Sequence, residues 1–202
     1  MTAYDEANVS RETSDMLSAY VDLVKKWTPK INLISKGSIE DIWSRHINDS
    51  AQIFELAPRS GHWVDLGSGG GFPGIVVSIL SKSSGAAHTF TLVESDQRKC
   101  AFLRTAAREL GLDIAIKAER VESLDPLDAD ILTARALAEL PVLLRFAERH
   151  LSSNGIAIFP KGATWQKEHS AAQAVWSYRC EAVTSTTNAA AAVLKIQEIT
   201  RV

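Results

Sequence analysis

The chain has 202 residues, of which 46% are hydrophobic and 23% charged, and this composition is typical of one globular domain and excludes wholesale disorder. The 22 basic and 24 acidic residues give a net charge of −2, which excludes a uniformly basic protein that coats nucleic acid. The two cysteines are too few for a disulfide framework, the histidines lack metal-ligand spacing, and there is no signal peptide or membrane span, so we expect a cytoplasmic protein without a metal.

The start of the chain predicts helices. Residues 1–12 carry no pattern and are expected to be loose. From Ser14 to Trp27 the apolar residues recur at helical spacing, and Pro29 is expected to end this helix. Ser38 has the features of an N-cap, and the helix that it would begin has an apolar face of Ile42, Ile47 and Ile53.

The rest of the chain alternates strands and helices. Five short apolar runs predict strands, at residues 63–66, 90–93, 114–116, 131–132 and 155–159. Helices are predicted between and after them, at residues 75–81, 98–110, 137–151 and 163–175. This alternation is typical of a parallel sheet with helices on both faces.

The last two predicted strands, residues 178–183 and 193–199, indicate an antiparallel hairpin at one edge of that sheet. The predicted fold is therefore α/β, with a mostly parallel seven-stranded sheet, an antiparallel edge hairpin and an N-terminal helical extension. We expect residues 1–60 to form a helical segment that packs on a main domain of residues 61–202.

A glycine-rich turn follows the first predicted strand. Gly67, Gly69 and Gly71 form a G-x-G-x-G pattern, and glycines there allow positive φ angles and the close approach of a ligand. Glu94 ends the next strand, where a carboxylate can accept hydrogen bonds from both hydroxyls of a ribose. The two features together predict a cofactor that contains a nucleoside.

The turn favours S-adenosylmethionine over a dinucleotide or a loop that binds nothing. A dinucleotide pattern, G-x-G-x-x-G, also occurs at Gly69, Gly71 and Gly74, but Phe72 and Pro73 crowd the place where a pyrophosphate would bind helix N–H groups. S-adenosylmethionine has no phosphate, and its sulfonium favours nearby acids such as Asp65.

Several motifs carry a resemblance to a known family. They are Asn32-Leu33-Ile34, Arg45-His46-Ile47-Asn48-Asp49-Ser50, the run from Asp65 to Gly74, Ala134-Arg135-Ala136, and Lys161-Gly162. On these motifs the chain, from about Leu17 to Ile199, resembles the RsmG family, also called glucose-inhibited division protein B. The resemblance implies a class I, Rossmann-like methyltransferase that uses S-adenosylmethionine to modify a guanine N7 in 16S ribosomal RNA.

The resemblance also implies roles for individual residues. Gly67, Phe72, Val121 and Glu122 would contact the cofactor. Asp65, Gly69, Gly71 and Glu94, which the pattern of the residues already indicates, complete the candidate cofactor site. Arg135 would lie at the cofactor and the reaction centre, and Lys161 would face the RNA, so both are candidate catalytic residues. The candidate RNA-binding residues are Lys161, Arg45, His46 and Lys36.

Some of these residues have simpler interpretations. Residues 25–49 carry a small excess of basic side chains, which forms either an RNA-binding face or a solvated helix end. Arg45 and Asp49 could form a helical ion pair, and the R-H-x-x-D-S motif could brace the helical segment. Residues 188–192, where relatives of this family commonly have a basic residue, have none, so no RNA contact is expected there.

The expected chemistry needs few catalytic groups. Guanine N7 has a free lone pair, so its methylation requires the base and the methyl carbon to be aligned and needs no general base. The expected partner is 16S rRNA in the small ribosomal subunit, and the protein is expected to be a monomer. Four alternatives remain open: another RNA site, a small-molecule substrate, a nucleotide-dependent oxidoreductase and a non-catalytic ribosome-assembly factor.

Overall fold

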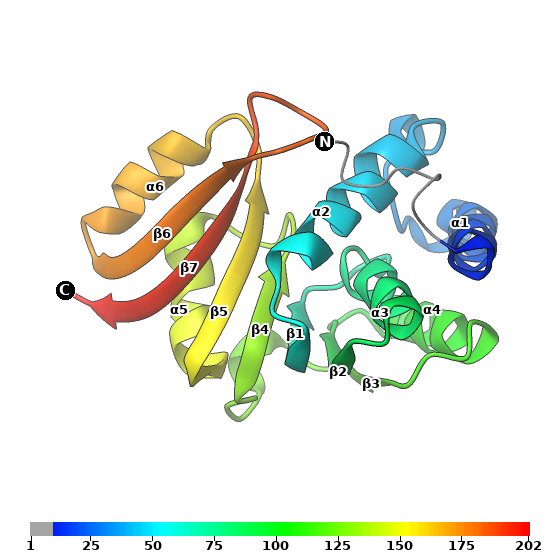
Figure 1. Cartoon of the computed structure of the whole chain (residues 1–202), viewed down its shortest axis with the longest axis horizontal. Helices are drawn as coiled ribbons and strands as arrows, with labels where there is room; N and C mark the ends of the chain where they lie inside the picture. The colour runs from blue at the N-terminus through cyan, green and yellow to red at the C-terminus, as the bar shows by residue number, and fades with distance from the viewer. Residues whose placement is uncertain (1–9) are drawn as a thin grey trace.

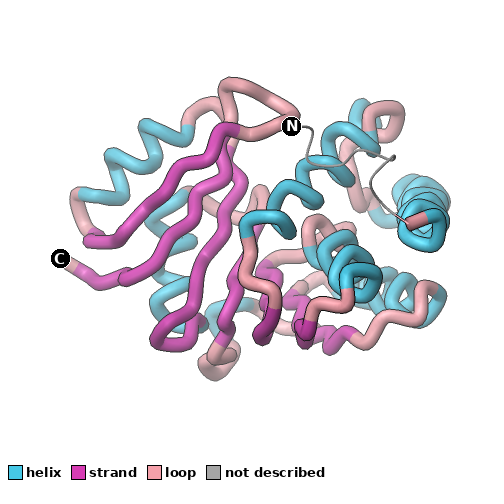
Figure 2. The backbone as a smooth tube through the Cα atoms, in the orientation of Figure 1, coloured by secondary structure: helices cyan, strands magenta, loops and turns pink. Residues whose placement is uncertain are grey.

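The computed structural model describes residues 10–202, and of Lys36 it describes only the backbone. One seven-stranded sheet runs through the molecule in the order β3-β2-β1-β4-β5-β7-β6 (Figures 1 and 2). Its strands are β1 (Ser60–Leu66), β2 (Ala87–Val93), β3 (Ile114–Lys117), β4 (Ala129–Ala134), β5 (Leu151–Lys161), β6 (Trp176–Thr184) and β7 (Ala192–Arg201).

The pairing of the strands confirms the predicted sheet. Strands β1 to β5 are parallel, while β7 lies antiparallel between β5 and β6. The chain thus reverses its strand order between β1 and β4, which is where ligands bind in sheets of this kind.

Helices cover both faces of the sheet. The main helices are α1 (Arg11–Ile31), α2 (Asp49–Leu56), α3 (Gly74–Ser84), α4 (Gln97–Glu109), α5 (Leu140–His150) and α6 (Trp165–Gln173). The first four share one apolar core with one face of the sheet, and α5 and α6 share a second core with the other face. Successive strand residues alternate between the two: Trp63 belongs to the first core and Val64 to the second.

The first helix is longer than predicted. It begins at Arg11, where the Ser10 hydroxyl caps the N–H of Thr13, and it continues through Pro29 to Ile31. Proline removes only one donor near the end of the helix, and the Thr28 hydroxyl donates to the Val24 carbonyl there. The remaining residues of the expected loose start, 1–9, lie outside the described residues.

The second helical segment differs from the prediction. Ser38 does not cap a helix: it closes a single 3-10 turn at residues 36–38. A π-helical turn then spans Trp43–Asn48 and leads directly into α2. Ile42 and Ile47 are both buried, and their five-residue spacing places them on one face only where the turn is π-helical. The apolar pattern therefore indicated burial correctly but not the type of turn.

The helical elements of residues 10–56 pack on the rest of the chain, because α1 contacts α3 and α4, and α2 contacts α3. Whether residues 1–60 form a unit of their own stays a prediction. The boundaries after β4 also differ, since α5 begins at Leu140 and not at residue 137, and β5 already begins at Leu151. No helix within residues 10–202 is long and apolar enough to cross a membrane.

Candidate active site

Two cavities adjoin at the carboxyl ends of the parallel strands. The smaller, of about 290 Å³, is lined by the glycine turn, the end of β2, residues 119–122 and residues 136–137. The larger, of about 710 Å³, is lined by the π-helical turn and α2, by Arg135 and Ala136, by the end of β5 and by the loop between β6 and β7. Ala136 lines both, so a molecule in one cavity would lie beside a molecule in the other.

The glycine turn has the conformation that its sequence predicts. Gly67, Gly69 and Gly71 have φ angles of 65°, 56° and 87°, which side chains rarely allow. A Cβ on Gly71 would lie 2.5 Å from the Ile75 side chain, whereas one on Gly69 would come no closer than 3.8 Å to any other atom. Gly71 is thus needed for packing, and Gly69 leaves open space for a ligand in the smaller cavity.

Glu94 is held rigidly at the wall of the smaller cavity. Its carboxylate accepts hydrogen bonds from the backbone N–H groups of Gly69, at 2.9 Å, and Asp96, at 2.8 Å. The side chain is only 8% exposed and lines the cavity. Each carboxylate oxygen has a second lone pair, so this group can still accept from the hydroxyls of a ribose.

Val121 and Glu122 line the same cavity, as the resemblance implies. Two side chains from the end of α5 hold their turn in place. His150 donates from Nε2 to the Val121 carbonyl at 3.2 Å, and Arg149 donates from Nη2 to the Leu124 carbonyl at 2.6 Å. Sequence analysis did not identify these two supports, because no local pattern pairs α5 with this turn.

Asp65 lies beneath the glycine turn and lines neither cavity. It is fully buried and accepts hydrogen bonds from the Thr133 hydroxyl at 2.8 Å and from the Gly74 N–H at 3.2 Å. Burial raises the pKa of Asp65 to about 6, although its hydrogen bonds and the charge of Arg135 act in the other direction. Asp65 therefore occupies the first N–H of α3, which a pyrophosphate would otherwise use.

We expect the Asp65→Asn variant to change how stability depends on pH. The unfolded chain loses the Asp65 proton near pH 4 and the folded chain near pH 6, so rising pH destabilises the wild-type fold across this window. Urea unfolding should therefore show the variant gaining up to about 3 kcal/mol over the wild type between pH 4 and pH 7.

A variant of His46 tests a pH dependence of stability that has the opposite direction. The pKa of His46 lies at about 4, below its ordinary value. The contribution of His46 to the free energy of unfolding therefore increases as pH rises from 4 to 6.5. His46→Gln should lose stability relative to the wild type over that range. For the first variant, the free energy of unfolding is compared with that of the wild type at each pH. If the two changed in parallel between pH 4 and pH 7, the assigned pKa of Asp65 would be wrong.

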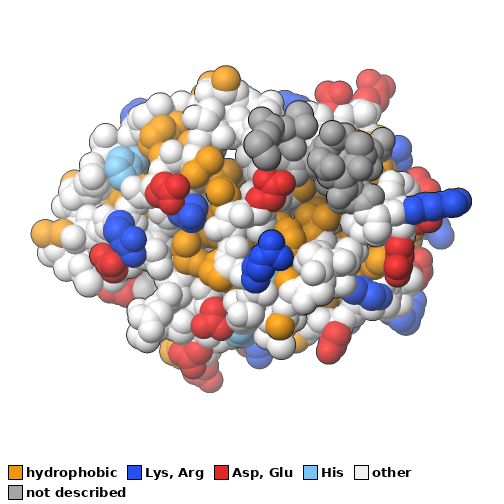
Figure 3. Space-filling view, in the orientation of Figure 1, with side chains coloured by type: hydrophobic (Ala, Val, Ile, Leu, Met, Phe, Trp, Pro, Cys, Tyr) orange, Lys and Arg blue, Asp and Glu red, His pale blue; other side chains and the backbone are white. Residues whose placement is uncertain are grey.

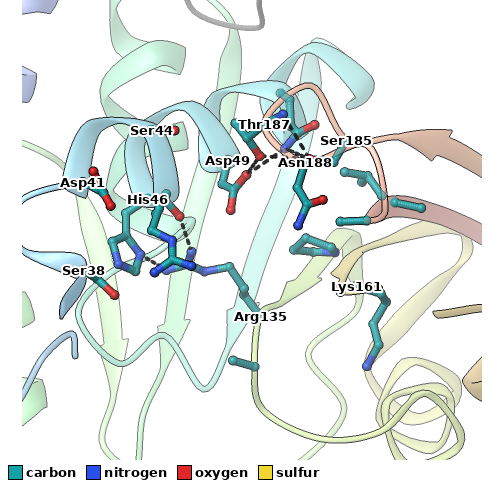
Figure 4. Close-up of a pocket in the computed structure, with 18 of the residues that line it drawn as sticks. Ser38, Asp41, Ser44, His46, Asp49, Arg135, Lys161, Ser185, Thr187 and Asn188 are labelled. Carbon is teal, nitrogen blue, oxygen red and sulfur yellow. Dashed lines mark hydrogen bonds between the residues drawn. The ribbon is translucent and has the colours of Figure 1, made fainter. Parts of the chain in front are cut away.

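Arg135 joins the loop after β4 to the helical segment (Figure 4). Its guanidinium donates to the Arg45 carbonyl at 3.1 Å and to Nδ1 of His46 at 2.7 Å, and it lies 5.3 Å from the centre of the Phe72 ring. Burial lowers the pKa of Arg135, and the negative charge of Asp49 opposes that shift. Arginine stays protonated at neutral pH, so a cation lies at the wall of the larger cavity.

His46 is neutral, and its hydrogen bond identifies the tautomer. Burial and the charges of Arg135 and Arg45 lower its pKa to about 4. Because Arg135 can only donate, Nδ1 accepts and the ring proton is on Nε2. Nε2 is buried and has no hydrogen-bond partner among the described residues.

Phe72 packs beneath this pair and lines neither cavity. Its ring centre lies 4.8 Å from that of His46 and 5.2 Å from that of Tyr20, whose hydroxyl donates to the Gly70 carbonyl. The structure thus places Phe72 between the glycine turn and Arg135, where it supports both. Its contact with the cofactor, which the resemblance implies, stays a prediction.

Asp49 does not form the ion pair with Arg45 that its spacing allows. Its Oδ1 accepts instead from the Thr187 hydroxyl and, at 3.3 Å, from the Gln52 amide. Gln52 also accepts from the Thr186 N–H at 3.1 Å. These bonds attach the loop between β6 and β7 to α2 across the larger cavity. Asn188, where no substrate contact was expected, lines this cavity.

Lys161 lines the larger cavity together with Arg45, His46 and Arg135, but its ammonium is bonded to other residues. Its ammonium lies 2.5 Å from Glu168 and donates to the Ala138 carbonyl at 3.1 Å, and the side chain is only 10% exposed. It lines the larger cavity but points away from Arg135 (Figure 4). The structure therefore places Arg45, His46, Arg135 and Lys161 around one cavity, with only the first three in contact with one another. The side chain of Lys36 is not among those that the structure describes.

The residues that line the two cavities are mixed in charge. On the face in Figure 3, basic and acidic side chains are interspersed. The described residues contain no group of three or more His, Cys, Asp or Glu side chains arranged to hold a metal ion. A nucleoside-containing cofactor fits the smaller cavity, because Glu94 presents a carboxylate and Gly69 presents bare backbone there.

Solved structures share the fold of this chain at low sequence identity. A TehB-like SAM-dependent methyltransferase from Corynebacterium glutamicum superposes with a TM-score of 0.59 at 16% identity, covering 90% of this chain and 98% of the other. TYW2 from M. jannaschii in complex with AdoMet gives a TM-score of 0.59 at 14% identity, covering 87% and 80%. The fold is therefore that of the Rossmann-like methyltransferases, as predicted.

The sequence comparisons are more specific. The model of the family described as rRNA small subunit methyltransferase G matches residues 13–197. Proteins named ribosomal RNA small subunit methyltransferase G are similar to this chain: one from Ruegeria pomeroyi is 57% identical over 96% of both chains, and one from Cereibacter sphaeroides is 48% identical over 98% of this chain and 96% of the other. The chain therefore belongs to the rRNA small subunit methyltransferase G family.

Proposed function

We propose that this protein transfers a methyl group from S-adenosylmethionine to N7 of a guanine in 16S rRNA. The observation that carries the proposal is the pair of adjoining cavities, which share Ala136. One presents a carboxylate suited to a ribose, and the other is large enough for a nucleotide and has Arg135 in its wall. Membership of the family supports small-subunit RNA as the substrate.

The residues of the smaller cavity would bind the cofactor. Glu94 would accept hydrogen bonds from the ribose hydroxyls, and Val121 and Glu122 would contact the adenine. Bound S-adenosylmethionine supplies an electrophilic methyl group. Asp65 and Gly71 do not reach the cofactor in this proposal; they hold the glycine turn in the shape that binds it.

The residues of the larger cavity would bind the target nucleotide. A base inside a duplex or a stack cannot reach a buried methyl group, so the target guanine enters the cavity unstacked. Arg135 holds the loop after β4 against the π-helical turn and thereby sets the position of the base. Since N7 carries a free lone pair, alignment of the base is the main catalytic contribution.

Lys161 would contribute by positioning. Its ion pair with Glu168, which also accepts from the Leu140 N–H at 3.0 Å, joins β5, α5 and α6 at the rim of the cavity. Arg45 is exposed beside the same cavity and is available to an RNA phosphate. The monomeric state and the cytoplasmic location of the protein stay predictions.

The decisive measurement is methyl transfer from labelled S-adenosylmethionine to small ribosomal subunits that lack the modification, followed by chemical cleavage at 7-methylguanine. We expect one cleaved position in 16S rRNA. Incorporation at a different atom or in a different RNA would overturn the assigned target. Cofactor binding without any incorporation would indicate a small-molecule substrate or a binding role in ribosome assembly.

A further inference from the structure

Asp49 lines the larger cavity, and only one of its two carboxylate oxygens is engaged in hydrogen bonds with other described residues. Oδ1 of Asp49 accepts from Thr187 and Gln52, and Oδ2 accepts no hydrogen bond from any residue in the described part of the chain. Figure 4 shows this second oxygen turned toward the open space above Arg135. Asp49 thus presents a fixed hydrogen-bond acceptor to whatever enters the cavity.

A fixed donor lies in the wall of the same cavity. Oδ1 of Asn188 accepts from the Ala190 N–H at 3.0 Å, which leaves the amide NH₂ of Asn188 as the group available to a ligand. Asn188 belongs to the loop that Thr187 and Gln52 attach to Asp49. One hydrogen-bonded unit therefore carries both an acceptor and a donor.

When N7 of the base is held at the methyl donor, an acceptor that faces N1 and a donor that faces position 6 complement guanine and not adenine. Guanine carries N–H donors at N1 and N2 beside the O6 acceptor, whereas adenine carries an acceptor at N1 and a donor at N6. Both bases have a free N7, so the chemistry of methyl transfer does not discriminate between them. Discrimination must come from the groups that contact the rest of the base.

We propose that Asp49 determines base specificity, its Oδ2 accepting from the N1–H and N2–H edge of the target guanine while the Asn188 amide donates to O6. The proposal rests on the proposed function, because it requires guanine to be the base that enters the larger cavity. Thr187 and Gln52 are positioning residues here, since they hold Oδ1 and so orient Oδ2.

The Asp49→Asn variant gives the sharpest test. Thr187 and Gln52 keep the amide oxygen in the Oδ1 position, so an NH₂ group replaces Oδ2 and turns the acceptor into a donor. Small subunits are reconstituted with transcripts that carry guanine or adenine at the target position. For the wild type we expect kcat/KM to be at least about 100-fold higher with guanine. In the variant we expect this ratio to fall at least 10-fold.

Thr187→Val is the matched control, because it removes one bond to Oδ1 but leaves the carboxylate. It is expected to lower the rate and to retain the preference for guanine. Affinity for S-adenosylmethionine, measured by calorimetry, should be unchanged in both variants, and thermal unfolding shows whether each is folded.

The outcomes separate this inference from the function on which it rests. A wild type that methylates no guanine contradicts the proposed function. A wild type that methylates guanine, together with an Asp49→Asn variant that retains the full preference, overturns the role of Asp49. Equal rates of the wild type on guanine and adenine overturn it as well, and this test does not depend on the folding of any variant.

Discussion

Arg135→Ala is expected to lower the rate of methyl transfer by about 1000-fold while the protein remains folded. Arg135 holds the loop after β4 against the π-helical turn through the Arg45 carbonyl and Nδ1 of His46, and it places a cation at the wall of the larger cavity. Without it, the target base loses both a partner and a fixed boundary. Single-turnover kinetics with unmodified small subunits measure the effect.

Two controls distinguish this role from a structural one. Arg135→Lys keeps the charge but cannot donate to both partners in the same plane, so it should recover only part of the rate. The charge of Arg135 is one of the causes of the low pKa of His46, so an NMR titration of Arg135→Ala should show that pKa rising from about 4. Full activity in the alanine variant would refute the catalytic role.

Glu94→Ala is expected to weaken the affinity for S-adenosylmethionine by about 100-fold. The variant removes the acceptor for the ribose hydroxyls, and hydrogen bonds to a charged group each contribute about 1.5–3 kcal/mol. It also releases the N–H groups of Gly69 and Asp96, which hold the glycine turn to the end of β2. Isothermal calorimetry with the cofactor alone measures the change.

The neighbouring Asp96 offers a matched control. Its side chain caps α4 by accepting from the N–H groups of Arg98 and Lys99, and it does not line the smaller cavity. Asp96→Ala should therefore lower stability by removing the cap of α4 and leave the affinity for the cofactor unchanged. If both variants bound the cofactor equally well, Glu94 would have no part in the cofactor site.

Lys161 and Asp49 form contacts in the structure that their sequence motifs did not predict. The role that the resemblance implies for Lys161, facing the RNA, stays a prediction; in the structure its ammonium pairs with Glu168 and donates to the Ala138 carbonyl. Asp49 appeared in the sequence only as part of a motif or as a helical ion-pair partner. In the structure it lines the larger cavity and bonds to a loop 138 residues away along the chain.

Elements that depend on neighbouring residues could be predicted from the sequence alone. The strand that stops at Gly67, the glycines with positive φ and the carboxylate that ends β2 all depend on neighbouring residues, and β–α alternation determines that their ends meet at one edge of the sheet. The fold and the position of Glu94 beside the glycine turn were therefore predictable from the residues, whereas Val121 and Glu122 were expected at the same cavity only from the resemblance.

The larger cavity could not be predicted, because it depends on long-range packing. Its walls come from segments that no spacing rule connects: the π-helical turn, the residues after β4 and β5, and the loop before β7. The bonds of Gln52 to Thr186, of Arg135 to His46 and of His150 to Val121 join residues 134, 89 and 29 positions apart. A polar side chain can form such a bond with many partners, and only the packing of the two cores selects which one lies within reach.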